Sequence, residues 1–433
     1  MYDFVVVANR LPVDRVGDRW QASPGGLVAA LAPVLRARGG CWVGWPGETN
    51  TSLAPFSAGG IELVPVPLDE ADYTDFYEGF SNSTLWPLYH DLIVAPQYHQ
   101  TWWERYVAVN ERFALSVEKQ AAHGATVWVQ DYQLQLVPGL LRERRPDLKI
   151  GFFLHIPFPS PDLFRQLPWR EEILSSLQAC DLIGFQRGTD EQNFCGLLLA
   201  DARVRTGTFP ISIDPDAVAP GDPARVRELV GNPELLMLGV DRMDYTKGIL
   251  QRLLAFERFL EAGHQATLIQ LATPSRERIE HYRETRREVE AAVGRINGRF
   301  GSVGRPVIHY VHHGVGKEEL GSYYAAADIM LVTPFKDGMN LVAKEYVACH
   351  PDGSGALVLS EFAGAAVELN RAHVCNPFDV ESVKNSIVAA IEAQDSPAAR
   401  DAMMQMNAHV REHDVSRWAE AFLSELAAVR RNR

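Results

Sequence analysis

Residues 335–348, FKDGMNLVAKEYVA, place two carboxylates, an asparagine and the start of a predicted helix directly after the apolar run DIMLVTP. Asn340 suits the N-cap of that helix because its side chain can accept a hydrogen bond from a backbone amide of the first turn. Asp337 and Glu345 can accept hydrogen bonds from sugar hydroxyls, and the first-turn amides can donate to a phosphate. The stretch indicates a site for a phosphorylated sugar. A capped helix with solvated charges is the simpler alternative.

Two cations follow another apolar run, in VDRMDYTKGI. Arg242 and Lys247 lie five residues apart across a turn after a predicted strand, where both could bind one diphosphate. An ordinary charged surface loop explains the same residues equally well. Gly25 and Gly26 precede a predicted helix in SPGGLVAAL, which would let backbone amides approach a phosphate. A plain turn is the commoner role of such a glycine pair.

A histidine and an aspartate end two neighbouring apolar runs. His155, in FFLHIPFPSP, is followed by three prolines within six residues, and Asp131 ends the run TVWVQDY. A lone histidine in apolar surroundings is more often a core residue, whereas the rigid proline-rich backbone beside Asp131 favours a site. His409 and His413 have the i, i+4 spacing of metal ligands, but no third ligand is near in sequence, so we predict no metal site.

Short apolar runs alternate with amphipathic helical stretches along the chain. The runs are FVVVANR, CWVGWPG, TVWVQDY, IGFFLHI, DLIGFQ, LLMLGVD, ATLIQLA, VIHYVHH, DIMLVTP and GALVLSE. Because the runs are continuously apolar, they predict parallel sheets covered on both faces, in an α/β architecture that is built twice. Four prolines and a glycine in residues 208–225 mark the break. We expect domains at residues 1–212 and 213–412, with a last helix at about residues 413–433 packing back on the first.

The composition limits the classes of function. The chain has 433 residues, 46% of them hydrophobic, and a formal net charge of −13. This charge disfavours binding to nucleic acid or to an anionic membrane surface, and no apolar stretch has membrane length. Five scattered cysteines form no CxxC pair, which disfavours a disulfide framework or a zinc site. The amino terminus lacks a signal-peptide pattern, so we expect a cytoplasmic protein.

Ten segments taken together resemble the trehalose-6-phosphate synthase family, glycosyltransferase family 20. In chain order they are VVVANRLPV, SPGGL, WVGWPG, FYEGFSNSTLWPLYH, QDYQLQLVPGLL, GFFLHIPFPSPDLF, VDRMDYTKGI, ATPSRER, GRINGRFG and VTPFKDGMNLVAKEYVA. The resemblance runs from residue 4 to about residue 426. It implies the α/β fold class GT-B, with two Rossmann-like parallel domains facing across a cleft, the first binding the acceptor and the second a nucleotide sugar.

The same resemblance implies a retaining transfer of glucose from a nucleotide-glucose, UDP- or GDP-glucose, to glucose 6-phosphate, giving α,α-trehalose 6-phosphate. It implies no cofactor and no metal, and we expect a homo-oligomer of two or four chains. A front-face transfer fits best, in which the departing phosphate takes the proton of the acceptor hydroxyl. Two alternatives stay open. One is a pseudo-glycosyltransferase that joins a nucleotide-activated cyclitol to an aminocyclitol phosphate, and the other is a non-catalytic subunit that senses sugar phosphates.

The resemblance implies residue roles position by position. The implied acceptor-binding residues are Arg10, Tyr77, Trp86, Asp131 and Arg276. The implied donor-binding residues are Gly25, Gly26, Arg242, Lys247, Val315, Asp337, Gly338, Met339, Asn340, Leu341, Val342, Ala343, Lys344 and Glu345. The implied catalytic residues are His155, Asp131, Arg242 and Lys247.

Two departures from the family pattern stand out. Val315 occupies the position where several relatives carry an aromatic residue beside the donor base, so the preference among UDP, GDP and ADP stays open. The chain is also shorter than family members before Thr208. A deletion and residues absent from the sequence would look alike.

Overall fold

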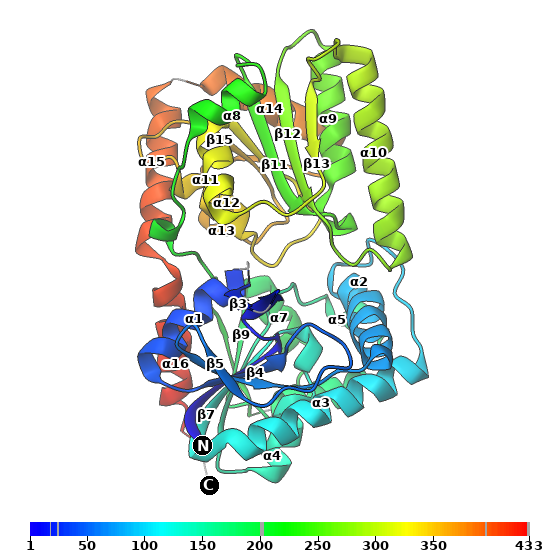
Figure 1. Ribbon diagram of the computed structural model, residues 1–433, viewed down its shortest axis with the longest axis vertical. Helices are drawn as coiled ribbons and strands as arrows, with labels where there is room; N and C mark the ends of the chain where they lie inside the picture. Colours follow the sequence, from blue (N-terminus) through cyan, green and yellow to red (C-terminus); the bar gives the residue numbers. More distant parts are fainter. Residues whose placement is uncertain (18, 24–25, 200–202, 395, 431–433) are drawn as a thin grey trace. The chain divides into compact units, whose positions relative to one another are not determined.

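The computed structural model describes residues 1–17, 19–23, 26–199, 203–394 and 396–430. Its backbone forms two compact units (Figure 1). The first unit comprises Met1–Ile211 together with Val415–Arg433, and the second comprises Ser212–Asp414. The first boundary therefore falls one residue before the position expected from the sequence. The last helix belongs to the first unit.

One large sheet forms the centre of the first unit. Its strand order is β10-β9-β8-β7-β1-β4-β6-β5, and only the β5–β6 pair is antiparallel. The strands are β1 (Tyr2–Arg10), β4 (Cys41–Trp45), β5 (Phe56–Ala58), β6 (Ile61–Pro65), β7 (Ala121–Gln130), β8 (Lys149–Phe153), β9 (Leu182–Phe185) and β10 (Arg205–Thr208). A separate hairpin pairs β2 (Val13–Val16) with β3 (Arg19–Ala22). Val5, Val6 and Val7 are fully buried, as expected where helices cover both faces of a sheet.

Helical segments join these strands. They are α1 (Gly26–Arg38), the π-helical η1 (Asp72–Leu85), α2 (Trp86–Tyr89), α3 (Gln100–Gln120), the 3-10 turn η2 (Tyr132–Leu134), α4 (Val137–Arg144), α5 (Pro161–Phe164), α6 (Arg170–Gln178), α7 (Gly188–Cys195) and α16 (Val415–Ala428). Strands β4, β6 and β5 lie on one side of β1 in the sheet, and strands β7, β8, β9 and β10 lie on the other side. The carboxyl ends of β1 and β7 thus form a topological switch point, where open α/β sheets bind ligands. Arg10 ends β1, and Asp131 follows β7.

The second unit repeats this plan with six strands, all of them parallel. Their order is β13-β12-β11-β14-β15-β16. The strands are β11 (Leu236–Arg242), β12 (Thr267–Thr273), β13 (Ile308–Val311), β14 (Ile329–Val332), β15 (Ala356–Ser360) and β16 (His373–Cys375). The direction of strand addition reverses between β11 and β14, which places the second switch point at their carboxyl ends.

The helical segments of the second unit alternate with its strands. They are η3 (Pro215–Ala217), α8 (Pro223–Leu229), η4 (Tyr245–Lys247), α9 (Ile249–Glu261), α10 (Glu280–Phe300), α11 (Lys317–Ala326), α12 (Leu341–Ala348), α13 (Ala365–Glu368), α14 (Val380–Ala393) and α15 (Pro397–Glu412). Helix α9 packs beside α10 and α14, and its apolar side joins the core with Leu253 and Phe256 fully buried.

Helix α16 inserts aromatic side chains into the first unit. The ring of Phe422 stacks on Trp128 of β7 with centroids 4.7 Å apart, and Trp418 lies 5.1 Å from Phe153 of β8. Gly184 of β9 leaves room for this packing, because an added Cβ would lie 2.8 Å from the Phe422 ring. The amphipathic stripe of the last helix is therefore covered by the sheet of the first unit.

The predicted fold class is confirmed: ten apolar runs coincide with strands β1, β4, β7, β8, β9 and β11 to β15. Strands β5, β6, β10 and β16 and the hairpin were not predicted. They are short or lie at sheet edges, where the apolar pattern is weak. Among the described residues, no helix is both long and apolar enough to cross a membrane.

Candidate active site

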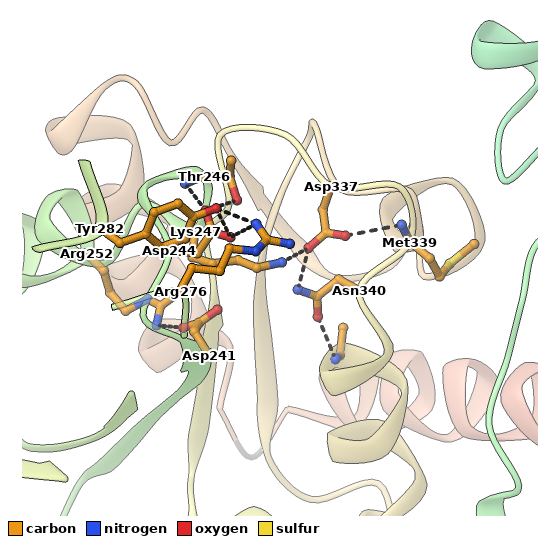
Figure 2. Close-up of polar contacts among 11 residues, drawn as sticks. Asp241, Asp244, Thr246, Lys247, Arg252, Arg276, Tyr282, Asp337, Met339 and Asn340 are labelled. Atoms are coloured by element: carbon orange, nitrogen blue, oxygen red, sulfur yellow. Dashed lines mark hydrogen bonds and ion pairs between the residues drawn. The ribbon is translucent and has the colours of Figure 1, made fainter. Parts of the chain in front are cut away.

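The switch point of the second unit brings together two segments that the sequence singled out. The turn after β11 carries Lys247, and the loop after β14 carries Asp337. Lys247 Nζ donates to Asp337 Oδ2 at 2.6 Å, and the two side chains are 14% and 15% exposed (Figure 2). The predicted phosphate-binding cation and the predicted sugar-binding acid, 90 residues apart in the chain, therefore lie side by side.

The loop after β14 is held in place by the start of α13. The amide of Gly364 donates to Asp337 O at 3.1 Å, and the amide of Ala365 donates to Met339 O at 2.7 Å. Gly364 cannot be replaced without movement, because an added Cβ would collide with Gly338 O. The loop backbone thus has a fixed position before α12 begins.

Asn340 is the N-cap of α12, which confirms that prediction. Its Oδ1 accepts a hydrogen bond from the amide of Ala343 at 3.2 Å, and its Nδ2 donates to Asp337 Oδ2 at 3.1 Å (Figure 2). The cap uses the amide of Ala343. The amides of Leu341 and Val342 have no acceptor within the helix, so a phosphate at this helix end would be within their reach.

Glu345, one turn into α12, is half-buried and oriented by Tyr324 of α11. Tyr324 OH donates to Glu345 Oε2 at 2.7 Å. Burial raises the pKa of Glu345 and outweighs the opposite effects of Tyr324 and of the nearby Lys317. Lys317 begins α11, two residues beyond Val315. The loop that carries Val315 therefore lies on the same side of the unit as Glu345.

Lys344 turns its side chain into the unit. It is 1% exposed, and its Nζ lies 2.7 Å from Glu368 Oε2 on α13. Burial lowers the pKa of Lys344, and Glu368 opposes that change. His409 Nε2 of α15 lies 3.1 Å from the other oxygen of Glu368, and the His409 ring stacks on His413 with centroids 4.2 Å apart. The ammonium of Lys344 thus ties α12 to α13. If Lys344 contacts the donor, it does so through its backbone atoms.

Asp244 stands at the centre of a polar network that the sequence did not suggest. Its buried carboxylate accepts hydrogen bonds from the amide and hydroxyl of Thr246, at 3.0 and 2.9 Å, and from Tyr282 OH at 3.4 Å (Figure 2). Arg276 Nη1 lies 3.5 Å away, and the same guanidinium contacts Tyr282 OH. Burial raises the pKa of Asp244, but the neighbouring cations outweigh burial and hold it below its ordinary value.

Arg242 and Arg276 both lie in the second unit, near Asp244. Arg242 ends β11 with an exposed side chain, and its charge is one of those that lower the pKa of Asp244. Arg276 follows β12 in a left-handed backbone conformation, with φ of 49°, and its side chain is 5% exposed. Arg276 is thus the one implied acceptor residue that lies in the second unit. The others, Arg10, Tyr77, Trp86 and Asp131, lie in the first unit.

A buried ion pair underlies this switch point. Arg252 of α9 is fully buried and donates to Asp241 Oδ2 at the end of β11. It also donates to Gln270 Oε1 of β12 at 3.0 Å and to Thr333 Oγ1, just after β14, at 3.1 Å. Burial raises the pKa of Asp241 and outweighs the opposite effect of Arg252. One guanidinium thus ties together the end of β11, the middle of β12 and the residue just after β14.

In the first unit, Arg10 and Tyr77 share an aromatic neighbour. The Arg10 guanidinium lies 5.0 Å from the ring centroid of Trp45, and the Tyr77 ring lies 6.4 Å from the same ring. Tyr77 belongs to η1, a π-helical segment of a kind that is often found at functional sites. Arg10 also donates to Asp14 at 2.6 Å with its side chain 45% exposed. The two predicted phosphate ligands therefore share Trp45 as a neighbour.

Trp86 and Asp131 lie near the carboxyl end of β7. Trp86 is 5% exposed, and its ring centroid is 5.6 Å from that of Tyr132, the residue after Asp131. Asp131 has φ of 72° and ψ of 171°, a backbone conformation that costs energy for any residue but glycine. Its Oδ1 accepts a hydrogen bond from the amide of His155 at 3.1 Å. This bond joins the strained aspartate to the proline-rich segment that begins at His155.

His155 has both ring nitrogens engaged within the protein. Its Nε2 lies 2.8 Å from Gln130 Oε1, and its Nδ1 lies 3.4 Å from Gln186 Nε2. The amide groups assign the proton to Nε2, because Gln130 offers an acceptor and Gln186 a donor. Burial lowers the pKa of His155 to about 3. The ring is thus neutral and oriented by the two glutamines.

The sequence analysis did not single out several residues of these networks, among them Asp244, Arg252, Tyr282 and Glu368. A signal existed for Arg252, which interrupts the apolar stripe of α9, and for Asp244, which precedes a turn as an N-cap does. Nothing local marks Tyr282 or Glu368, because their partners are distant in sequence.

Some predictions fall outside the described residues. Gly25 lies there, whereas Gly26 begins α1. Residues 200–202, in the stretch before Thr208 that is shorter than in family members, lie there too. Within the described parts of the chain, no three His, Cys, Asp or Glu side chains gather as they would around a metal ion.

Comparisons with known proteins show which chains this one is similar to. Trehalose-6-phosphate synthase of Mycobacterium sp. strain KMS is 52% identical over 468 residues, which cover 99% of this chain and 96% of that protein. The enzyme of Mycobacterium tuberculosis strain CDC 1551 / Oshkosh is 51% identical, covering 99% and 95%.

Solved structures of related enzymes match as well. One is an α,α-trehalose-phosphate synthase (UDP-forming) from Burkholderia xenovorans in complex with glucose-6-phosphate, with a TM-score of 0.89, 33% identity and 98% and 99% of the chains covered. Another, from E. coli, is bound with UDP-2-fluoro glucose, with a TM-score of 0.89, 34% identity and 99% of each chain covered.

Two parallel α/β sheets with polar side chains at both switch points, matched by these structures, define a glycosyltransferase of the GT-B class. A model of glycosyltransferase family 20 matches residues 2–428. The chain belongs to glycosyltransferase family 20, as its ten segments predicted.

Proposed function

We propose that this chain transfers glucose from a nucleotide-glucose to glucose 6-phosphate with retention of configuration and so forms α,α-trehalose 6-phosphate. Membership of family 20 and the near full-length similarity to trehalose-6-phosphate synthases support this function. The observation that carries it is the pairing of Lys247 with Asp337 at the switch point of the second unit. This pairing sets a phosphate-binding cation beside an acid that can accept sugar hydroxyls.

The donor binds at the switch point of the second unit. Arg242 and Lys247, hereafter the donor clamp, hold the diphosphate together with the first amides of α12. When the donor binds, Asp337 releases Lys247 and accepts hydrogen bonds from the hydroxyls of the glucose instead. Glu345, which is already oriented by Tyr324, accepts hydrogen bonds from the ribose hydroxyls. The base lies toward Val315, whose small side chain selects less strongly among bases than an aromatic ring would.

The phosphate of the acceptor binds to Arg10, Tyr77 and Arg276. Guanidinium groups bind a phosphate dianion through paired, charge-assisted hydrogen bonds. The ion pair of Arg10 with Asp14 is nearly half exposed, so it stabilises the protein little and exchanges easily for a phosphate. Trp86 and Asp131 lie near the carboxyl end of β7, beside the end of β1 that carries Arg10. There they would contact the sugar ring of glucose 6-phosphate.

The transfer takes place on one face of the glucose. The bond from C1 to the diphosphate oxygen breaks, a bond from C1 to the anomeric oxygen of glucose 6-phosphate forms, and the acceptor proton passes to the departing phosphate. The donor clamp stabilises the charge that grows on the leaving group. Because both nitrogens of His155 are engaged, its ring orients this region and does not take the proton.

Initial rates test this function. The purified protein is incubated with glucose 6-phosphate and with UDP-, GDP- or ADP-glucose, and the product is identified by NMR from its α,α linkage. We expect trehalose 6-phosphate with at least one donor, and the ratio of rates reports the base preference. Absence of this product with all three donors would overturn the proposal and leave a cyclitol substrate or a sensing role.

A further inference from the structure

The two oxygens of the Asp244 carboxylate serve different partners. Oδ1 accepts the amide and the hydroxyl of Thr246, the residue directly before Lys247 of the donor clamp. Oδ2 lies 3.4 Å from Tyr282 OH and 3.5 Å from Arg276 Nη1. One oxygen thus faces the donor side of the site, and the other faces the residue assigned to the acceptor phosphate (Figure 2).

The donor side of this network is rigid. The amide of Lys247 donates to Asp244 O at 3.1 Å, and the amide of Phe335 donates to Thr246 O at 2.8 Å. These bonds join the turn after β11 to the loop after β14, where Asp337 meets Lys247. A movement of this turn would therefore shift Lys247 relative to Asp337, and the Asp244 carboxylate holds the turn through Thr246.

The acceptor side depends on Asp244 as well. Arg276 has a left-handed backbone, which a non-glycine residue adopts only with support from its surroundings. Its guanidinium contacts Tyr282 OH and lies 5.4 Å from the centroid of the Tyr282 ring. Tyr282 and Asp244 are both buried, so their hydrogen bonds form in surroundings of low dielectric constant, where they are stronger than in water. Tyr282 and Asp244 thus both hold the Arg276 guanidinium.

We propose that Asp244 is a positioning residue that couples the two substrate sites, by fixing the turn that carries Lys247 through one carboxylate oxygen and Arg276 through the other. This inference rests on the proposed function for the roles of the clamp and of Arg276. Asp244 touches neither substrate, and it acts only through the residues that do.

Three substitutions separate the two halves of the network. Asp244→Asn keeps the shape but weakens both sides, so the dissociation constants of UDP and of glucose 6-phosphate should each rise about tenfold or more. Thr246→Val removes only the hydroxyl on the donor side and should weaken UDP several-fold while glucose 6-phosphate changes less than about twofold. Tyr282→Phe keeps the ring but loses the hydroxyl on the acceptor side. It should weaken glucose 6-phosphate several-fold, while the dissociation constant of UDP changes less than about twofold.

Binding is measured by calorimetry with UDP and with glucose 6-phosphate as probes, so the result does not depend on turnover. Asp222→Asn, at the exposed N-cap of α8, is the matched control and should change neither constant, because asparagine caps helices as well as aspartate. Urea unfolding of each variant shows whether it folds. If Asp244→Asn does not fold, the opposite effects of Thr246→Val and Tyr282→Phe decide the question.

The outcomes distinguish this inference from the proposed function. A protein that binds both probes but forms no trehalose 6-phosphate contradicts the proposed function alone. An Asp244→Asn protein that folds and weakens only one probe overturns the coupling. Equal effects of Thr246→Val and Tyr282→Phe on both probes would also overturn it, since the two oxygens would then not act separately.

Discussion

Lys247 is the residue on which the proposed chemistry depends most. Its ammonium is mostly buried and already faces an acid, so it is held where a leaving phosphate would need it. Lys247→Ala should lower kcat about a hundredfold or more, because a positioned charge at a developing oxyanion contributes that much. Lys119→Ala, on the exposed face of α3, is the control. Unchanged turnover in Lys247→Ala would remove this residue from the mechanism.

His155 makes the stability of the chain depend on pH. Its folded pKa of about 3 lies below the ordinary value of 6.5, so the unfolded chain binds a proton in this range that the folded chain does not. Stability from this group is therefore full above about pH 6.5 and falls as pH decreases, by about 1.4 kcal/mol per pH unit.

The variant His155→Gln isolates this effect. The difference in unfolding free energy between the natural chain and the variant should shrink as the pH is lowered from 7 to 4, because glutamine does not titrate. Urea titrations at each pH measure it. Parallel pH profiles of the two proteins would show that His155 takes up its proton in the folded state as easily as in the unfolded state.

At the scale of elements, the ion pair of Lys344 with Glu368 joins α12 to α13. Because Lys344 is fully buried and Glu368 mostly so, Lys344→Met should cost about 3 kcal/mol, since the carboxylate loses the ammonium and keeps its contact with His409. The double variant Lys344→Met/Glu368→Leu should cost clearly less than the sum of its two single variants. Urea unfolding of the four proteins gives the coupling energy.

An exposed ion pair of the same unit provides the comparison. Lys384 Nζ lies 2.5 Å from Glu381 Oε2 on α14, and the Glu381 side chain is 55% exposed. Lys384→Met should change the unfolding free energy by no more than about 0.5 kcal/mol. Additive effects of the Lys344 and Glu368 substitutions would mean that the two helices are held by packing alone.

At the scale of the whole molecule, the last helix completes the unit that contains the first strand. Phe422 is fully buried against Trp128, and its neighbours include Phe153 and Phe209. Phe422→Ala should cost about 3 to 5 kcal/mol. Hydrogen exchange should show the loss in β7 and β8 of the first unit and not in β11 and β12 of the second.

Val303→Ala, at a fully exposed position, is the control for this substitution and should leave exchange unchanged. Equal loss of protection in both units would show that they unfold together. The expected homo-oligomer of two or four chains and the cytoplasmic location stay predictions, and sedimentation of the purified protein measures the first.

The sequence by itself determined the framework of the protein. Continuous apolar runs predicted the long strands. Because parallel strands have their carboxyl ends at the same end of a sheet, the loops after β11 and β14 were expected there together. Asn340 could be predicted as an N-cap because capping is a contact between near neighbours. The family followed from the ten segments together, since no single motif was specific enough.

Only the tertiary structure decided which side chains meet. Lys344 was predicted at the donor, yet its ammonium lies on Glu368, and the imidazole of His155 lies between two glutamines. Asp244 joins the donor clamp to Arg276 through partners up to 38 residues away. The physical reason is the range of the interactions. Hydrophobic periodicity and caps act over a few residues and can be read from the chain, whereas a buried polar group pairs with whatever the packing of distant elements brings beside it.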